Sequence, residues 1–235
     1  MTNQTVVPQS IGVILDGNRR WARAKGLSVF EGHRAGYNKM KEFIGWARDA
    51  GVRAVIAYVF STENWGRAPE EVSYLMNLLR EALAEREISA YKKENIKIRV
   101  IGDRTMLEED MRTWIARAEE HTKDQSGMTL VFLLSYGGRR EIVYAASRLV
   151  ESMRNNTLRG VIDEKMFAKY LWTADIPDPD LIIRAGGERR LSNFLLWQAA
   201  YSELMFISTL WPDFSKEEFC AILDEYAKRE RRFGA

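Results

Sequence analysis

Short apolar runs alternate along the chain with longer stretches whose apolar residues recur at helical spacing. The short runs predict strands at 11–15, 54–60, 96–101, 129–134, 181–183 and 204–206. The longer stretches predict helices at 34–50, 69–95, 108–122, 139–154, 163–170 and 216–231. Strand and helix alternate throughout, which is typical of an α/β fold: a mostly parallel central sheet of about six strands flanked by helices.

The chain has no internal repeat, low-complexity tract or Pro/Gly/Ser-rich linker, so we expect residues 1–235 to form a single domain. Its one cysteine, Cys220, excludes an internal disulfide and a cysteine-based zinc site. No apolar run approaches the ~18–20 residues that span a bilayer. We therefore expect a globular, cytoplasmic protein.

Charge is nearly balanced in total but unevenly placed. Lys and Arg number 35 against 33 Asp and Glu, a formal net charge of +2, and this lack of a basic excess argues against nucleic acid as a partner. Arginines nevertheless recur in the segments that follow four predicted strands. These segments are 16–21, 61–67, 135–140 and 184–192.

The carboxyl ends of parallel strands meet at one edge of a sheet, where ligands bind in open α/β folds. Arginine recognises phosphate and carboxylate through paired hydrogen bonds, and neighbouring glycines let backbone N–H groups approach an anion. The sequence therefore predicts an anion site at this edge, suited to a phosphorylated or diphosphorylated substrate.

Three residues are candidates for further chemistry. Asp16 could hold Mg²⁺ against a phosphate, or it could cap a helix. Glu203, just before the last predicted strand, is a second candidate carboxylate, although an ordinary charge at a strand end is the better interpretation from spacing alone. His33, at a predicted helix start, could donate to an anion or be a partly exposed bystander.

Several motifs together resemble the cis-prenyltransferases, whose best-known members are the bacterial undecaprenyl diphosphate synthases. The matching segments are Asp-Gly-Asn-Arg-Arg-Trp-Ala at 16–22, Gly-His-Arg-Ala-Gly at 32–36, Phe-Ser-Thr-Glu-Asn-Trp-Gly-Arg at 60–67, Ser-Tyr-Gly-Gly-Arg at 135–139, Asp-Leu-Ile-Ile-Arg at 180–184, Gly-Gly-Glu at 186–188, Arg-Leu-Ser-Asn-Phe-Leu-Leu-Trp at 190–197, Tyr-Ser-Glu-Leu at 201–204, Trp-Pro-Asp at 211–213 and Arg-Glu-Arg-Arg-Phe-Gly at 229–234. They fall in family order and span nearly the whole chain.

The resemblance implies a Mg²⁺-dependent enzyme that condenses isopentenyl diphosphate head-to-tail onto an allylic diphosphate, usually farnesyl diphosphate, with each new double bond cis. The implied product is undecaprenyl diphosphate, a lipid-carrier precursor. A homodimer with at most peripheral membrane contact is expected. The alternatives are a shorter-chain or unusual-coupling cis-prenyltransferase, and a non-catalytic subunit of a hetero-oligomeric prenyltransferase.

Matching positions also imply roles for individual residues. Asp16 and Asn64 would be catalytic, and Asn64 would act in proton removal with help from Ser61. Asp16 would hold Mg²⁺, and Glu203 would complete that metal site across the homodimer. The implied substrate-binding residues are Gly17, Asn18, Arg19, Arg20, Trp21, His33, Ser61, Thr62, Glu63, Trp65, Arg67, Arg184, Glu188, Arg190, Leu191 and Ser192. Arg-Phe-Gly at 232–234 would reach the active site of the neighbouring subunit.

The chain departs from the family pattern at four positions. Val29 stands where the family usually has an arginine, so one phosphate contact is missing or is supplied by Arg23, Lys25 or Arg34. Ala185 replaces a usual threonine, and Ser135 often corresponds to asparagine. Val59 is bulkier than the alanine common in long-chain synthases, which favours a shorter product.

Overall fold

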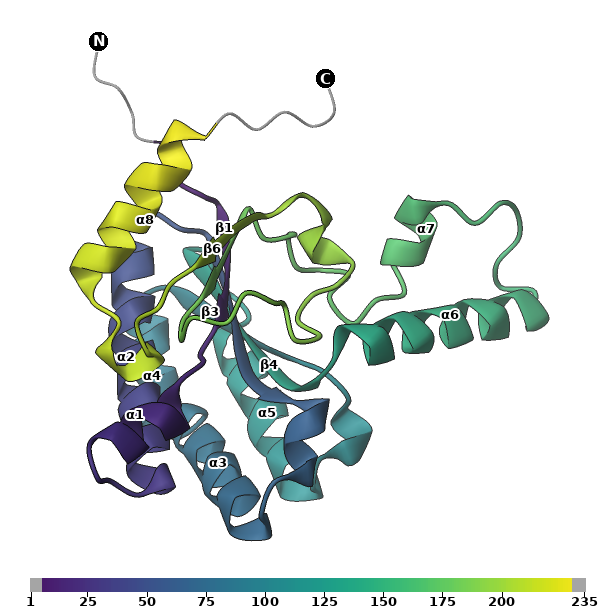
Figure 1. The fold of residues 1–235 in the computed structure, drawn as a ribbon. Coiled ribbons are helices and arrows are strands. Elements are labelled where there is room, and N and C mark those ends of the chain that lie inside the picture. Colours follow the sequence, from purple (N-terminus) through teal and green to yellow (C-terminus); the bar gives the residue numbers. More distant parts are fainter. Residues whose placement is uncertain (1–5, 230–235) are drawn as a thin grey trace.

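Six parallel strands form one sheet in the computed structural model, which describes residues 6–229 (Figure 1). The strands are β1 (Ser10–Ile14), β2 (Ala54–Ser61), β3 (Ile96–Ile101), β4 (Met128–Tyr136), β5 (Leu181–Arg184) and β6 (Glu203–Phe206). Their order is β3-β4-β2-β1-β5-β6, and every adjacent pair is parallel. The predicted α/β fold is confirmed, and all the carboxyl ends lie at one edge.

Helices connect these strands. They are α1 (Asn18–Ala24), α2 (Val29–Asp49), α3 (Pro69–Ala82), α4 (Glu85–Lys93), α5 (Glu109–Thr122), α6 (Gly138–Arg154), α7 (Glu164–Ala168) and α8 (Lys216–Lys228). Short 3₁₀ helices are η1 (Thr62–Gly66), η2 (Arg104–Met106), η3 (Gln198–Tyr201) and η4 (Trp211–Asp213). Within the described part of the chain, no helix is both long and apolar enough to cross a bilayer.

The start of the chain carries more helix than the apolar pattern predicts. α1 occupies most of the first arginine-bearing segment. α2 begins at Val29 rather than near residue 34, because Ser28 and Glu31 form a reciprocal capping box there. Capping therefore extends α2 by more than a turn, so that His33 lies within the helix.

The single helix predicted over 69–95 is wrong, because the structure divides it into α3 and α4. The backbone leaves the helical conformation at Leu83 and is extended at Ala84. This turn allows Ile88 and Tyr91 of α4 to be buried in the core. No glycine or proline marks the break, so local sequence rules miss it.

The two faces of the sheet are covered differently. One face packs against helices, with Phe43 of α2, Ile115 of α5 and Phe219 of α8 in a large apolar cluster. The other face carries a smaller cluster in which Phe194 and Leu195, from an irregular segment, pack over the strands. The helices are therefore concentrated on one face, while coil covers the other.

α6 and α7 extend away from the sheet (Figure 1). Only Gly138, Glu141, Ala145 and Leu149 of the long α6 are buried. Glu141 anchors its base, because its carboxylate accepts hydrogen bonds from the Tyr136 hydroxyl, at 2.5 Å, and the Thr173 backbone N–H, at 3.0 Å. Most of α6 is therefore exposed, and the hydrogen bonds of Glu141 fix its N-terminal end. We call this helix the exposed arm.

Candidate functional site

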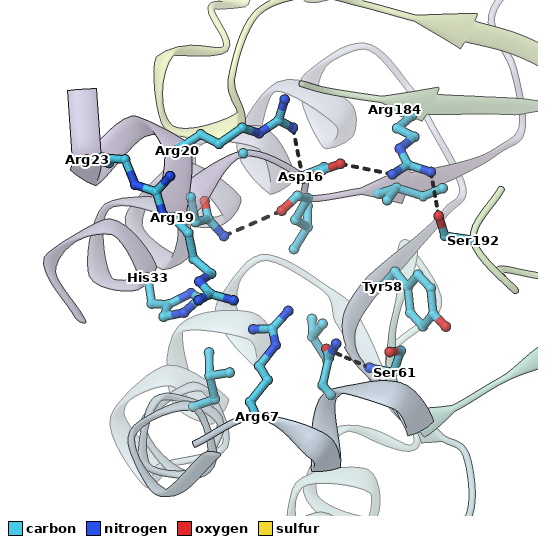
Figure 2. Close-up of a pocket in the computed structure, with 17 residues that line it drawn as sticks. Asp16, Arg19, Arg20, Arg23, His33, Tyr58, Ser61, Arg67, Arg184 and Ser192 are labelled. Atoms are coloured by element: carbon cyan, nitrogen blue, oxygen red, sulfur yellow. Dashed lines mark hydrogen bonds and ion pairs between the residues drawn. The ribbon is translucent and has the colours of Figure 1, made fainter. Parts of the chain in front are cut away.

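A cavity of about 540 Å³ lies at the carboxyl edge of the sheet, between the ends of β1, β2 and β5 and helices α1 to α3 (Figure 2). It brings together predicted site residues from four separate segments. Those that line it are Asp16, Gly17, Asn18, Arg19, Arg20, His33, Ser61, Asn64, Arg67, Arg184 and Ser192. The parallel topology thus places the arginine-bearing ends of three strands around one space.

The turn after β1 depends on two close approaches. Gly17 has φ +111°, in the left-handed region, and a Cβ there would lie 2.8 Å from the Leu210 side chain. Gly36 of α2 has no Cβ to displace the Asn18 side chain, which lies directly against it. These contacts seat α1 against α2 and direct Asn18 and Arg19 of α1 toward the cavity.

Asp16 joins two arginines at the end of β1. Its Oδ1 accepts from Arg20 NH2 at 3.1 Å, and its Oδ2 accepts from Arg184 NH2 at 2.9 Å. Arg20 also donates to the Gly186 carbonyl at 2.8 Å. Arg184 is deeply buried and donates through NH1 to Ser192 Oγ at 2.8 Å and to the Arg190 carbonyl. Two guanidinium groups are therefore held at the cavity by hydrogen bonds to fixed partners.

Glu71 of α3 is a second carboxylate that gathers cations, and sequence reasoning assigned it no role. Its Oε1 lies 3.0 Å from His33 Nε2, 3.0 Å from Arg67 NH1 and 3.9 Å from Arg19 Nε. An acid in the first turn of a helix looks like an ordinary dipole partner, and Arg67, four residues earlier, is its only local cation. The packing of α3 beside α2 brings it to His33 and Arg19 as well.

Burial and charge set the protonation of this pair. Burial lowers the pKa of His33 more than the hydrogen bond to Glu71 raises it, so the imidazole is neutral near neutral pH. Burial alone would raise the pKa of Glu71, but the His33 hydrogen bond and the charges of Arg67 and Arg19 outweigh it, and the pKa is lowered. His33 is therefore a neutral imidazole whose Nε2–H donates to the ionised Glu71.

The end of β2 supplies the opposite wall. Ser61 N–H donates to Asn64 Oδ1 at 3.1 Å, which holds the amide of Asn64 in the first turn of η1 at the cavity. The Tyr58 hydroxyl donates to the Tyr136 carbonyl at 3.2 Å, and burial raises the pKa of this phenol. Tyr58 lines the cavity although it was not predicted to, because it precedes the recognisable motif.

Seven predicted substrate residues lie outside the cavity lining. The Trp21 indole donates to Asp213 at 2.6 Å, and that of Trp65 donates to Ser135 at 2.9 Å. Glu63 accepts from the Asn193 amide at 2.8 Å. The others are Thr62, Glu188, Arg190 and Leu191, in segments that adjoin the cavity. Their proposed substrate roles stay predictions.

Asp16 and Glu203 of one chain are far apart along the sheet. Leu181, at the start of β5, pairs with Glu203, so Glu203 lies at the amino edge while Asp16 lies at the carboxyl edge. The Glu203 carboxylate accepts from Arg229 at 2.6 Å. Within residues 6–229, no group of three or more His, Cys, Asp or Glu side chains is placed to hold a metal ion. Asp16 alone, with phosphate oxygens, fits Mg²⁺, which often uses one or two carboxylates.

A small apolar pocket of about 80 Å³ continues from the cavity between α2, α3 and the sheet. The two spaces share Leu15, Asn18, His33, Val59 and Leu75. Beyond them the pocket is lined mainly by apolar side chains, among them Met40, Ile44, Leu78, Leu79 and Phe132. The arrangement therefore suits an anionic group attached to a hydrocarbon.

Comparisons with known proteins agree with this chemistry. The sequence model of the undecaprenyl diphosphate synthase family matches residues 14–234. An isoprenyl transferase of Rhizobium meliloti is 46% identical, over 99% of this chain and 94% of that protein. A farnesyl-diphosphate-specific undecaprenyl-diphosphate synthase of Micrococcus luteus is 41% identical, over 99% and 93%. The crystal structure of lavandulyl diphosphate synthase from Lavandula x intermedia, in complex with dimethylallyl diphosphate, superposes with a TM-score of 0.93 at 35% identity, covering 97% of this chain and 99% of that one.

Proposed function

Because the chain belongs to the undecaprenyl diphosphate synthase family, we propose that it condenses isopentenyl diphosphate head-to-tail onto an allylic diphosphate to form cis double bonds. The observation that carries this proposal is the junction of an arginine-lined cavity with an apolar pocket. The cavity supplies cations for diphosphates, and the pocket accepts the hydrocarbon of the allylic substrate. Farnesyl diphosphate is the proposed allylic substrate.

The reaction breaks the C–O bond of the allylic diphosphate, whose electron pair leaves with the diphosphate. A new C–C bond forms to the terminal alkene carbon of isopentenyl diphosphate, and that substrate then loses a proton. Arg19, Arg20 and Arg67 face the cavity and would stabilise charge developing on the leaving group. Arg184 and Ser192 would hold isopentenyl diphosphate at the far end of the cavity.

Asp16 would hold Mg²⁺, and the ion would neutralise diphosphate charge during departure. Asp16 also keeps Arg20 and Arg184 in place through its two oxygens. Asn64 would donate to a diphosphate oxygen and orient it, because its Oδ1 is already bonded to Ser61 N–H and its amide N–H₂ remains available. These groups position the two substrates for one displacement.

The product proposed first is undecaprenyl diphosphate. A shorter product is the second candidate, favoured by the apolar pocket, whose volume of about 80 Å³ is well below the roughly 300 Å³ of a typical small-molecule site. Val59 forms part of the wall where this pocket meets the cavity. A farnesyl chain, and any longer one, would require α2 and α3 to move apart around it.

Product analysis tests both the activity and the chain length. Purified protein with Mg²⁺, farnesyl diphosphate and labelled isopentenyl diphosphate is expected to give a ladder of elongated products, resolved by chromatography after dephosphorylation. A ladder that ends near 20–25 carbons would replace the undecaprenyl product with the shorter one. No incorporation by the purified chain would favour a non-catalytic subunit and contradict the proposed activity.

A homodimer is also proposed, formed through the exposed arm. Val143, Val150 and Met153 of α6 are exposed and lie at i, i+7 and i+10, which places them on one stripe of the helix. The family resemblance implies a homodimer, and a second copy of the same chain would cover this stripe. Val150→Glu is expected to convert a dimer into a monomer in light scattering, whereas a wild-type protein that is already monomeric would contradict the proposal.

A further inference from the structure

Five guanidinium groups line the cavity, and four of them have a carboxylate partner. Arg20 and Arg184 bind Asp16, while Arg67 and, at a longer distance, Arg19 contact Glu71. Two carboxylates therefore serve four arginines, and the cavity holds an excess of positive charge. The fifth arginine, Arg23, contributes to that excess and forms no ion pair with a carboxylate in the described part of the chain.

Arg23 lies in the last turn of α1 and lines the cavity. Among residues 6–229 it has no ion pair or hydrogen bond from its side chain. Figure 2 shows it beside Arg19, at the end of the cavity opposite Arg184 and Ser192. An uncompensated guanidinium in such a position is available to bind a phosphate oxygen.

The neighbouring cations are already occupied elsewhere. Lys25 lies 4.3 Å from the centre of the Trp21 ring and 3.5 Å from Asp213. Arg34 donates to Glu81, with NH2 2.8 Å from Oε1, and does not line the cavity. Val29 carries no charge. Arg23 is therefore the one additional cation of this region that the cavity can use.

The position of Arg23 indicates which substrate it meets. His33 and Asn18 line both the cavity and the apolar pocket, and Figure 2 places His33 beside Arg19. A diphosphate bound at this end would have its hydrocarbon beside the apolar pocket. Arg184 and Ser192, at the other end, are not among the residues that line that pocket.

We propose that Arg23 binds the terminal phosphate of the allylic diphosphate and takes no part in binding isopentenyl diphosphate. This inference rests on the proposed function, because it takes the two substrates from it. Loss of one charged hydrogen bond to phosphate at an exposed side chain is expected to weaken binding about tenfold.

Equilibrium binding tests the inference without turnover. Farnesyl diphosphate and isopentenyl diphosphate are titrated separately, each with Mg²⁺, against wild type, Arg23→Ala, Arg23→Lys and Lys25→Ala. Arg23→Ala is expected to weaken farnesyl diphosphate about tenfold and to leave isopentenyl diphosphate unchanged. Arg23→Lys should retain most of the affinity, because it keeps the charge.

Lys25→Ala is the matched control, since it removes an equal charge from the same segment but outside the cavity. If Lys25→Ala and Arg23→Ala weaken farnesyl diphosphate binding equally, the loss comes from the overall positive charge of the segment. That result would overturn a direct contact between Arg23 and the phosphate. Unchanged farnesyl diphosphate binding by Arg23→Ala, or equal loss of both substrates, would also overturn it. If wild type makes no elongated product while Arg23→Ala still loses farnesyl diphosphate selectively, the proposed function fails and the Arg23 contact stands.

Discussion

Two carboxylates gather guanidinium groups around the same cavity, and they differ in what can reach them. The side chain of Asp16 is 28% exposed and lines the cavity, whereas that of Glu71 is 9% exposed and does not. Each contacts two basic side chains at 3.1 Å or less. An accessible carboxylate can exchange partners for a metal ion or substrate, while a buried one can only hold its partners in position.

The two carboxylates therefore serve different purposes within one site. Asp16 lies where charge changes during the proposed reaction, so its loss should affect turnover. Glu71 lies behind Arg67 and His33, so its loss should affect the placement of those groups and the stability of the fold. Variants at the two positions separate these effects.

The largest effect is expected at Asp16. Asp16→Ala should lose nearly all turnover, with kcat down roughly 10³-fold, the size of effect seen when one group that stabilises transition-state charge is removed. Incorporation of labelled isopentenyl diphosphate measures it. Asp16→Asn is the companion variant, because it keeps an acceptor for buried Arg184 while removing the charge. Wild-type turnover in folded Asp16→Asn would remove the Asp16 charge from the mechanism.

A smaller effect is expected at Glu71. Glu71→Gln keeps the shape of the side chain but weakens its bonds to His33 and Arg67, so the free energy of unfolding should fall by about 1–3 kcal/mol at neutral pH. Turnover should fall much less than in Asp16→Asn. Denaturant titration measures the stability, and an activity loss as large as that of Asp16→Asn would contradict the positioning role.

This stability difference should depend on pH in a defined direction. The pKa of Glu71 is lowered in the folded state from its ordinary value of 4.5, so its contribution is fully present above that pH and is lost as the pH falls through the folded value. The difference between wild type and Glu71→Gln is therefore expected to shrink as the pH is lowered from neutrality to below 4.5. A difference that stays constant over this range would be inconsistent with an ionised Glu71 as the source.

Much of the fold could be predicted, because strands and helices leave periodic patterns in nearby residues. All six predicted strands are present, and parallel topology brings the segments that follow β1, β2 and β5 to one edge. The break between α3 and α4 could not be predicted, since its cause is the burial of Ile88 and Tyr91 against distant parts of the chain. Helix propensity depends on neighbouring residues and carries no information about such a distant contact.

The candidate site, too, could be predicted from the sequence only in part. By itself, the sequence determined the α/β alternation, the arginines that follow the strands and the family motifs, all of which are properties of neighbouring residues. Only the tertiary structure decided that Glu71 also holds His33, that Arg23 faces the cavity with no partner among residues 6–229, and that Glu203 lies at the opposite edge from Asp16. Those outcomes depend on which elements pack together, and the electrostatic environment of a side chain is set by neighbours that are remote in sequence.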